Sequence, residues 1–403
     1  MICLLLFNYI CQLFSMKMKN LLLSVLFLGF FANSQTFNQD YANVSNLVSQ
    51  TNINTYLQEF EALGVKTTGS TANNNAYTWL KNKYLSFGYS EAEITKDTFT
   101  YGGQSTSNII VTKTGTKYPN TYVIVCGHYD TITGPGTNDN GSGVSVILEL
   151  ARLLKNVPTE YSIKFINFSG EEQGLLGSAH YVNSVVNATS PKMSIRLVLN
   201  IDEVGGIKGQ TNDTITCERD ESNSPSSNNS ASNTFTQQLM NCVTLYSTLK
   251  TNLSYAYSSD YMPFQANGEV ITGLFEYNET PYAHTVNDKY SNLDPVYIYN
   301  IAKATTGAVQ HFAIASQMLS VDNVKEAVSN FTVSPNPAKD YIQIEFSNSK
   351  NQKFSFTITS LEGKIVCQTE NQTRIEISKL PKGVYLGNFK IGEQQITKKI
   401  IVE

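Results

Sequence analysis

The sequence predicts an α/β fold with a central, mostly parallel mixed sheet flanked by helices, followed by a small C-terminal β-sandwich. Between residues 50 and 320, apolar strand-like runs alternate with helical patterns, which is typical of a largely parallel sheet covered by helices. Over residues 331–403 the pattern changes to short alternating β-like runs separated by Gly and Pro turns. This second pattern predicts a separate β-domain, joined through a linker near residues 320–330.

The N-terminal residues have the order of a secretory signal peptide. Within residues 16–35, two lysines come first, then an apolar stretch, then small residues that end at Ser34. We assign residues 1–34 to a signal peptide cut near Ser34, and the sequence leaves open whether translation starts at Met16 or Met18. A membrane anchor is the alternative, but the apolar run is short for one. No stable membrane span is therefore expected.

The elements of the first domain, residues 35–320, follow in order. Helical patterns occupy residues 52–64 and 73–89, and the second pattern ends at Gly88. Strand-like runs come next, at 108–115, 121–127, 161–170 and 195–205. The remainder predicts a polar low-complexity loop at 222–233, a helix near 234–249, a strand near 270–276 and a long closing helix over 295–319.

Composition narrows the class of protein. The 403 residues suffice for one large domain and one smaller domain. A net charge of −4, without a basic patch interleaved with aromatics, argues against nucleic-acid binding. Export implies an oxidising destination. Cys126 ends an apolar run and is expected in the core, whereas Cys217 and Cys242 could pair, and the sequence leaves that pairing open.

Side chains that bind metal ions follow the strand-like runs, and active sites of open α/β sheets lie where strands end and helices begin. These positions hold His128, Asp130 and Asp139 after the second run, Glu171 and Glu172 after the third, Asp202 after "LVLNI" (197–201) of the fourth, and His284 after the strand expected near 270–276.

Each of these side chains alone has a structural explanation. Asp139, for example, precedes "NGSG" and could be only a turn and a helix cap. Together they form the set that a two-metal site needs, because imidazole and carboxylate suit Zn²⁺ and two neighbouring ions require a shared carboxylate. The sequence therefore predicts a metal site.

Four motifs resemble a known family: "GHYDT…GTNDNGSG" (127–143), "SGEEQGLLGS" (169–178), "NIDEVG" (200–205) and "AHTVNDKYSNLDP" (283–295). In content and order they are similar to the co-catalytic di-zinc aminopeptidases of the bacterial leucyl aminopeptidase type, peptidase family M-28. The resemblance covers residues 50–318 and implies a zinc-peptidase fold. It also implies a secreted metalloaminopeptidase, a hydrolase that removes N-terminal residues from peptides or proteins.

The resemblance implies the ligands of two Zn²⁺ ions per chain. Asp139 would bridge the ions, His128 and Asp202 would complete the ligands of one, and Glu172 and His284 those of the other. The physiological metal, which could also be Co²⁺ or Mn²⁺, stays open.

The same resemblance implies roles for the remaining site residues. Glu171 would be the general base that takes a proton from a water shared by the two zinc ions. Asp130 would hold His128 in its tautomer, as metal-bound imidazoles require. Tyr255 or Tyr257 could stabilise the oxyanion, and the sequence does not decide between them.

The C-terminal stretch resembles a second family. "SPNPAKD", "SLEGKIV", "LPKGVYLGNFKIG" and the final "KKIIVE" look like the C-terminal sorting domain of the bacterial type IX secretion system. This implies secretion machinery as a partner and export through the periplasm and outer membrane to the cell surface or the medium. A carbohydrate- or surface-binding β-module is the alternative.

Three rival functions remain. A glutaminyl cyclase shares the fold and uses one zinc, so metal stoichiometry would separate it from a peptidase. A carboxypeptidase of the family should need a basic pocket, yet the arginines of the first domain, Arg152, Arg196 and Arg219, lie outside the motifs. The third rival is a non-enzymatic binding protein on the same scaffold, although the expected ligands and base are all present.

Overall fold

The computed structural model describes residues 35–221, 223–316, 331–346, 353–360, 364–391 and 394–403. The predicted signal peptide and the linker expected near 320–330 lie outside the described residues. The chain divides into two units, residues 1–317 and 318–403. Within the described ranges, no helix combines the length and the apolar character needed to cross a bilayer.

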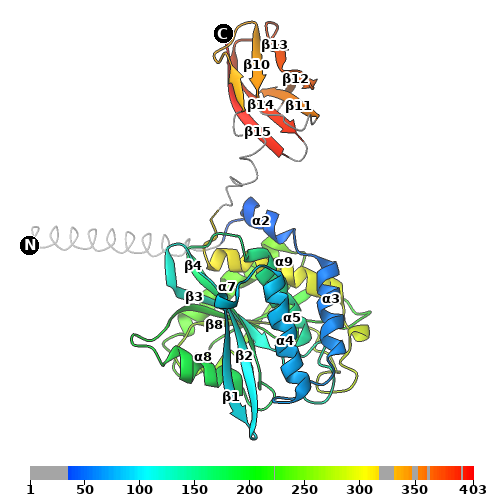
Figure 1. Cartoon of the computed structure of the whole chain (residues 1–403), viewed down its shortest axis with the longest axis vertical. Coiled ribbons are helices and arrows are strands. Elements are labelled where there is room, and N and C mark those ends of the chain that lie inside the picture. The colour runs from blue at the N-terminus through cyan, green and yellow to red at the C-terminus, as the bar shows by residue number, and fades with distance from the viewer. Residues whose placement is uncertain (1–34, 222, 317–330, 347–352, 361–363, 392–393) are drawn as a thin grey trace, which may run out of the picture. The chain divides into compact units, whose positions relative to one another are not determined.

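Eight strands in the described part of the first unit form one mixed sheet in the order β1-β2-β4-β3-β5-β8-β6-β7 (Figure 1). They are β1 (Ile94–Tyr101), β2 (Gln104–Lys113), β3 (Tyr118–His128), β4 (Tyr161–Phe168), β5 (Ser194–Ile201), β6 (Thr214–Arg219), β7 (Lys250–Tyr255) and β8 (Ile271–Glu276). Strands β4, β3, β5 and β8 are adjacent and mutually parallel, whereas β1–β2, β2–β4 and β6–β8 pair antiparallel. The predicted mostly parallel mixed sheet is confirmed.

The sequence missed β1, β6 and β7. Most side chains of β1 are exposed or half-buried, and β7 shows the same pattern. Both strands lie at the edges of the sheet, so neither carries the apolar signal of a buried strand. Strand β6 is short and mixes polar with apolar residues, and its partners β7 and β8 stabilise it through backbone pairing.

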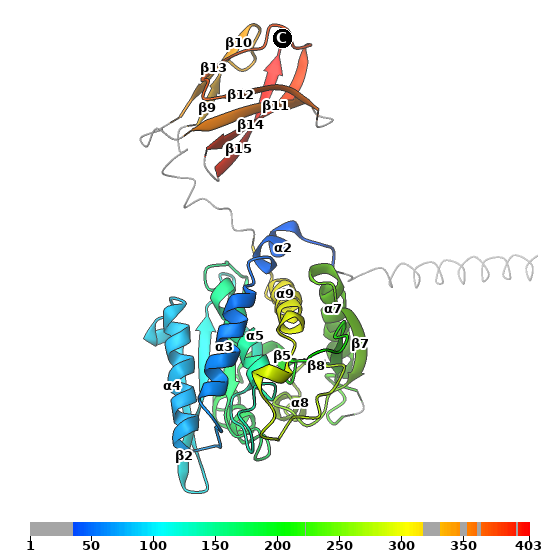
Figure 2. The same cartoon turned by 90° about the vertical axis from the view of Figure 1, so that its right-hand side faces the viewer.

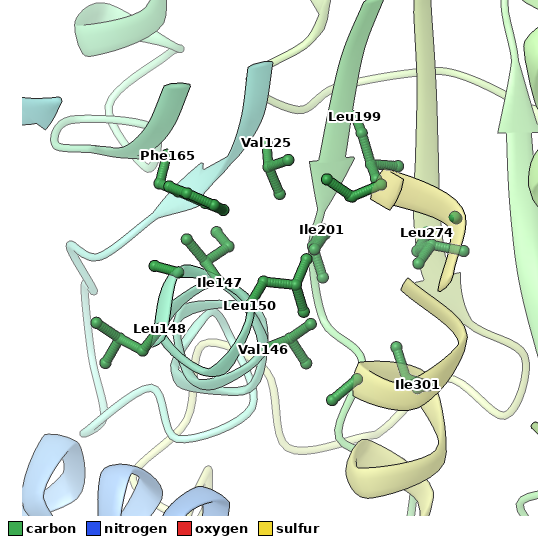
Figure 3. Packing of buried hydrophobic residues seen from close by; sticks show 14 of the residues in the cluster. Val125, Val146, Ile147, Leu148, Leu150, Phe165, Leu199, Ile201, Leu274 and Ile301 are labelled. Carbon is green, nitrogen blue, oxygen red and sulfur yellow. The ribbon is translucent and has the colours of Figure 1, made fainter. Parts of the chain in front are cut away.

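Helices cover both faces of the sheet. Successive strand residues point to opposite sides, and here both sets of side chains are apolar and buried, so each face needs a covering layer. Val125 belongs to the core shared with α3 (Gln50–Ala62), α5 (Gly141–Leu154), α7 (Asn229–Tyr246) and α9 (Pro295–Phe312) (Figure 2). Its neighbour Cys126 belongs to the core on the other face, with α6 (Leu176–Tyr181), the following turn (Val182–Val186) and α8 (Met262–Ala266). Figure 3 shows Ile147 and Leu150 of α5 packed against Phe165 and Ile201 of the sheet.

Two predicted boundaries were wrong. Helix α7 begins at Asn229, inside the expected loop of 222–233. Ser232 explains this, since its hydroxyl donates to the carbonyl of Ile271 (2.5 Å) and accepts from the amide of Asp220 (2.8 Å), so contacts with the sheet stabilise a polar first turn. Helix α9 ends at Phe312 rather than 319, where Ile314 adopts a left-handed backbone and Ala315 pairs with Thr159.

The described part of the first unit also contains two α-helices, α2 (Gln39–Ser45) and α4 (Thr71–Ser86), and the 3₁₀ turns Glu91–Glu93 and Tyr290–Asn292. The helical patterns at 52–64 and 73–89 correspond to α3 and α4, and serines cap both helices at their N-termini. In the described part of the chain, Cys126, Cys217, Cys242 and Cys367 are free, so Cys217 and Cys242 form no disulfide in this structure.

The second unit consists of two antiparallel sheets, in the orders β13-β10-β9 and β12-β11-β14-β15. The strands are β9 (Thr332–Ser334), β10 (Tyr341–Glu345), β11 (Phe354–Ser360), β12 (Ile365–Glu370), β13 (Arg374–Glu376), β14 (Gly383–Ile391) and β15 (Gln394–Val402). Ile342, Ile344, Phe356 and Phe389 from both sheets are buried in one apolar core. This confirms the predicted C-terminal β-sandwich.

Candidate metal centre

The candidate site lies at the carboxyl ends of the parallel strands β3, β4, β5 and β8. His128 is the last residue of β3, and Asp202 directly follows β5. Glu171 and Glu172 are the third and fourth residues after β4 ends, and His284 lies on the loop that follows β8. Because these strands are parallel neighbours, the sheet brings the ends of four distant segments to one edge.

The loop between β3 and α5 carries Asp139 and depends on close backbone approaches. A side chain at Gly134 would collide with the carbonyl oxygen of Thr285, and one at Gly143 with that of Ile201. Asn140 caps α5 by accepting from the amide of Gly143 (2.9 Å) and donates to the carbonyl of Ile201 (2.9 Å). The loop is therefore fixed against both β5 and the segment that carries His284.

The structure brings the predicted ligands together in two groups that share one residue. In the first group, Nε2 of His128 lies 3.1 Å from Oδ1 of Asp139 and 3.3 Å from Oδ1 of Asp202. In the second, Nε2 of His284 lies 3.0 Å from Oδ2 of Asp139 and 3.0 Å from Oε2 of Glu172. Each carboxylate oxygen of Asp139 thus faces a different histidine.

These spacings fit zinc. Two ligand atoms about 2.0–2.1 Å from a tetrahedral zinc ion are separated by about 3.3–3.4 Å, close to the distances within each group. The donors are imidazole nitrogens and carboxylate oxygens, which zinc accepts. The side chains of the cluster therefore fit zinc binding.

Asp202 supplies a second observation in favour of a metal ion. Its Oδ2 accepts a 2.5 Å hydrogen bond from Ser259, which in turn accepts one from Asn200 (2.8 Å). Its Oδ1 is buried and, within the described residues, accepts no hydrogen bond, although it faces His128. A buried acceptor that lacks a donor is costly, and coordination to a metal ion would satisfy it.

Asp130 is fully buried and connects two parts of the site. Its carboxylate accepts from the backbone amides of Glu171 (3.2 Å) and Glu172 (3.3 Å) and from the hydroxyl of Thr68 (3.1 Å). Nδ1 of His128 lies 3.7 Å from the same carboxylate and 3.2 Å from the carbonyl oxygen of Asp130. Asp130 thus contacts His128 and also holds the loop with the two glutamates, and its role in fixing the tautomer of His128 stays a prediction.

Glu171 stands beside the two groups, close to several other acids. Burial is the main cause that raises the pKa of its carboxyl group to about 9, and the negative charges of Asp202 and Asp260 add to the rise. A divalent cation nearby would favour the ionised carboxylate and so act in the opposite direction.

His284 occupies the most exposed position of the set, with 56% of its side chain accessible. Its backbone is left-handed (φ 57°), a conformation that a non-glycine residue adopts only when its surroundings impose it. The carboxylate of Asp288 accepts from the backbone amides of Asn138 (2.6 Å) and Asp139 (3.0 Å). The loop that carries His284 is thereby bonded to the backbone of the shared ligand.

Sequence reasoning missed three supporting residues: Ser259, Glu276 and Asp288. Buried Glu276 accepts from the amides of Gly206 (2.7 Å) and Thr280 (2.6 Å) and from the side chain of Asn138. Asp288 lies within a motif that carries the family resemblance, and Ser259 lies in the region that the resemblance covers. Nothing in the sequence shows which backbone amide or carboxylate they meet. Those contacts depend on the folding of distant loops.

The two tyrosines considered for the oxyanion are both exposed, Tyr255 by 53% and Tyr257 by 57%. The ring of Tyr255 lies against Arg219. Tyr257 lies within the field of the site, since burial and then the charges of nearby acids, including Asp202, raise the pKa of its hydroxyl. The oxyanion role of either tyrosine stays a prediction.

Sequence comparison identifies two regions. Residues 108–309 match peptidase family M28, and residues 332–403 match the secretion system C-terminal sorting domain. Over 118 residues, 28% of this chain, the sequence is 44% identical to aminopeptidase YwaD of Bacillus subtilis. The match spans 25% of that relative's length.

Two solved structures resemble the first unit. The LapA aminopeptidase of Legionella pneumophila superposes with a TM-score of 0.60 at 19% identity, covering 70% of this chain and 75% of that one. A glutaminyl cyclase of Macrostomum lignano superposes with a TM-score of 0.61 at 15% identity, covering 72% of this chain and 97% of that one. Both likenesses establish the fold alone, and the fold is common to two different reactions.

Proposed function

The chain belongs to peptidase family M28, and we propose that it is an exported aminopeptidase that uses two zinc ions to remove the first residue of peptides. The observation that carries this proposal is the placement of Asp139 between two ligand groups, with one carboxylate oxygen toward His128 and the other toward His284. A single ion would leave one of these groups without a purpose.

The residues divide into ligands and a base. His128 and Asp202 would hold one ion, Glu172 and His284 the other, and Asp139 would hold both. Zinc ions in this position would polarise the scissile carbonyl and lower the pKa of a bound water toward neutrality. Glu171 takes the proton of the attacking water on its carboxylate and delivers it to the nitrogen of the leaving amine.

Hydrogen bonds from neighbouring residues hold the ligands and the base in position. Asp130 orients His128 and bonds the backbone of Glu171, so the base and a ligand share one buried support. Ser259 fixes one oxygen of Asp202 and leaves the other directed at the first group. Mutation of such hydrogen-bond partners of metal ligands typically lowers metal affinity or activity by about 10- to 100-fold.

The C-terminal unit supports export. Its match to a sorting domain accords with a protein delivered to the cell surface or the medium, and we propose type IX secretion machinery as its partner. Peptides outside the cell would then be the substrates.

The arginines of the first unit argue against a carboxypeptidase, which would need a cation for the terminal carboxylate. Arg152 pairs with Glu149, and Arg196 lies over the ring of Tyr161 and donates to the carbonyl of Phe312. Arg219 bonds to Asn233. Each therefore has a partner away from the ligand groups.

A glutaminyl cyclase is the second candidate, because a cyclase shares the fold. It would need one ion rather than two. Elemental analysis of the folded protein separates the candidates: about two zinc ions per chain support the peptidase, and one supports the cyclase.

The test of the proposed function uses the chain from residue 35 onward. Leucine p-nitroanilide and its N-acetylated form are compared before and after treatment with a chelator. We expect cleavage of the free-amine substrate only, loss with the chelator and recovery with zinc. Cleavage of neither substrate by a folded, zinc-loaded sample would contradict an aminopeptidase.

The role of the base is tested with Glu171→Gln. This variant should keep its zinc, because Glu171 is not among the ligands, and lose activity by about 10²- to 10⁴-fold. Unchanged activity would remove Glu171 from the mechanism, and a non-enzymatic scaffold would predict no activity in either protein.

A further inference from the structure

One acidic side chain next to the ligands has no role in the mechanism above. Glu203 directly follows Asp202 at the end of β5. Its Oε2 is buried and, in the described part of the chain, has no hydrogen-bond partner. A buried carboxylate oxygen without a donor is unfavourable, so its position calls for a group that the folded chain does not itself provide.

The backbone holds Glu203 in place. Its φ is +43°, a left-handed conformation that is uncommon outside glycine, and such conformations gather at functional sites. Its carbonyl accepts from the amide of Glu276 (2.9 Å), and the amide of the next residue, Val204, donates to Ser142 (2.8 Å). The residue is thus fixed between the ends of β5 and β8 and the start of α5.

The backbone that follows Glu203 is bonded to the loop of the shared ligand. The amide of Gly205 donates to the side chain of Asn138 (2.7 Å), and the hydroxyl of Ser142, which accepts from the amide of Val204, donates to the carbonyl of Asn138 (2.7 Å). Asn138 directly precedes Asp139, so Glu203 lies beside the segment that carries the shared ligand.

We propose that Glu203 binds the α-ammonium group of the substrate's first residue. This inference rests on the proposed function and adds a specificity-determining residue to it. The α-nitrogen is two bonds from the scissile carbonyl carbon, so its acceptor must lie beside the ligands, as Glu203 does. The ammonium of a lysine side chain is four methylene groups further away. An ammonium donates to the carboxylate and neutralises its charge, whereas the N–H of an acylated amine can donate but carries no charge.

The first test measures kcat/KM for leucine p-nitroanilide in Glu203→Gln, which keeps the size of the side chain and removes its charge. We expect a loss of about 10- to 100-fold, as for the loss of one hydrogen bond to a charged group, with zinc content unchanged. Glu279→Gln is the matched control, because Glu279 is an exposed glutamate on the loop after β8. It should stay within about twofold of the unmodified enzyme.

The second test does not depend on turnover. Calorimetry compares L-leucinol, which has the amine, with 4-methylpentan-1-ol, which lacks it, on the zinc-loaded proteins. Leucinol should bind Glu203→Gln about tenfold or more weakly than the unmodified protein, whereas 4-methylpentan-1-ol should bind both equally. Glu203→Asp, which retains the charge, should recover part of the affinity for leucinol.

These outcomes separate the inference from the function it rests on. Equal leucinol binding by both proteins, or unchanged kcat/KM in Glu203→Gln while the unmodified enzyme cleaves the substrate, overturns the role of Glu203 and leaves the aminopeptidase standing. A loss confined to lysine p-nitroanilide overturns the α-ammonium assignment in favour of a side-chain contact. A weaker leucinol affinity in an enzyme that cleaves no aminoacyl substrate keeps the ammonium site and refutes the aminopeptidase.

Discussion

The two ligand groups of the candidate centre differ in how the fold holds them. His128, of whose side chain 1% is accessible, stands at the end of a central strand with Asp202 beside it. His284, with 56% accessible, stands on a loop. We name these the buried group (His128, Asp202) and the open group (Glu172, His284). The sheet positions the buried group, whereas the open group depends on hydrogen bonds between loops.

This difference indicates that the two ligand groups contribute differently to stability and to substrate access. The buried group stands at the ends of the central strands β3 and β5. In the open group His284 is exposed to solvent, from which a peptide must arrive, whereas only 4% of the Glu172 side chain is accessible. Asp139 joins the two, so its removal should affect both, while changes on either side should have distinct effects.

The largest effect is expected for Asp139→Ala, which removes the residue that connects the groups. Zinc should fall from about two ions per chain to fewer than one, and kcat/KM should fall by about a thousandfold or more. Elemental analysis and leucine p-nitroanilide hydrolysis measure these quantities. Asp213→Ala, at a surface aspartate paired with Lys250, is the control. One ion retained at full occupancy would refute the sharing of Asp139.

The next effect compares the loss of stability when the histidine of each group is removed from the metal-free protein. His128→Ala leaves buried Asp202 without its histidine and Asp139 with His284 alone, and should cost about 3 kcal/mol or more in the free energy of unfolding. His284→Ala removes a side chain that is 56% accessible, so solvent screens its pairs with Asp139 and Glu172 and the cost should be smaller, about 1 kcal/mol. Denaturant unfolding in chelator measures both. Equal losses would abolish the distinction between the buried and open groups.

A smaller effect is expected for Ser259→Ala, which removes the hydrogen bond to Asp202. Affinity for the ion of the buried group should fall by about 10- to 100-fold, as measured by titration against zinc buffers, while the ion of the open group is unaffected. The neighbouring Ser258 is exposed, and Ser258→Ala serves as the control. A uniform loss for both ions would contradict a contact limited to the buried group.

The last effect concerns the pH dependence of stability and Lys66, which bonds to the loop that carries Asp139. It is fully buried, and its Nζ donates to the carbonyls of Gly64 (2.7 Å) and Pro135 (2.6 Å). Burial lowers the pKa of Lys66 to about 7, against the opposing charges of Asp288, Glu61 and Asp130. Between pH 7 and the pKa of an exposed lysine, about 10.4, the unfolded chain therefore binds more protons than the folded chain.

Stability of the metal-free protein should accordingly rise between pH 7 and pH 9.5, by up to about 3 kcal/mol relative to Lys66→Met. Urea unfolding at pH 7 and pH 9.5 measures the difference between the two proteins. An identical pH dependence in both would show that Lys66 keeps its proton in the folded chain, and the loop would then rest on a permanent charge.

The sequence predicted the buried strands of the sheet and failed for the exposed strands at its edges. Strands β3, β4 and β5 are apolar along most of their length, so their sequence alone predicts them. The side chains of the edge strands β1 and β7 are exposed or half-buried, so these strands lack the apolar run that predicts a buried strand. The polar start of α7 was mistaken for a loop, because the contacts of Ser232 with Ile271 and Asp220 that stabilise it come from residues distant in sequence or across a turn.

The sequence by itself determined which side chains can bind metal, since His128, Asp139, Glu172, Asp202 and His284 lie at strand ends or on the loops after them in a motif order that resembles M28 peptidases. Only the tertiary structure decided that each oxygen of Asp139 faces a different histidine, that Asp288 holds the backbone of Asp139, and that Glu203 has a buried oxygen without a partner. The physical reason is that a residue's chemistry is local, whereas distances and hydrogen-bond partners depend on segments up to about 150 positions apart in the chain.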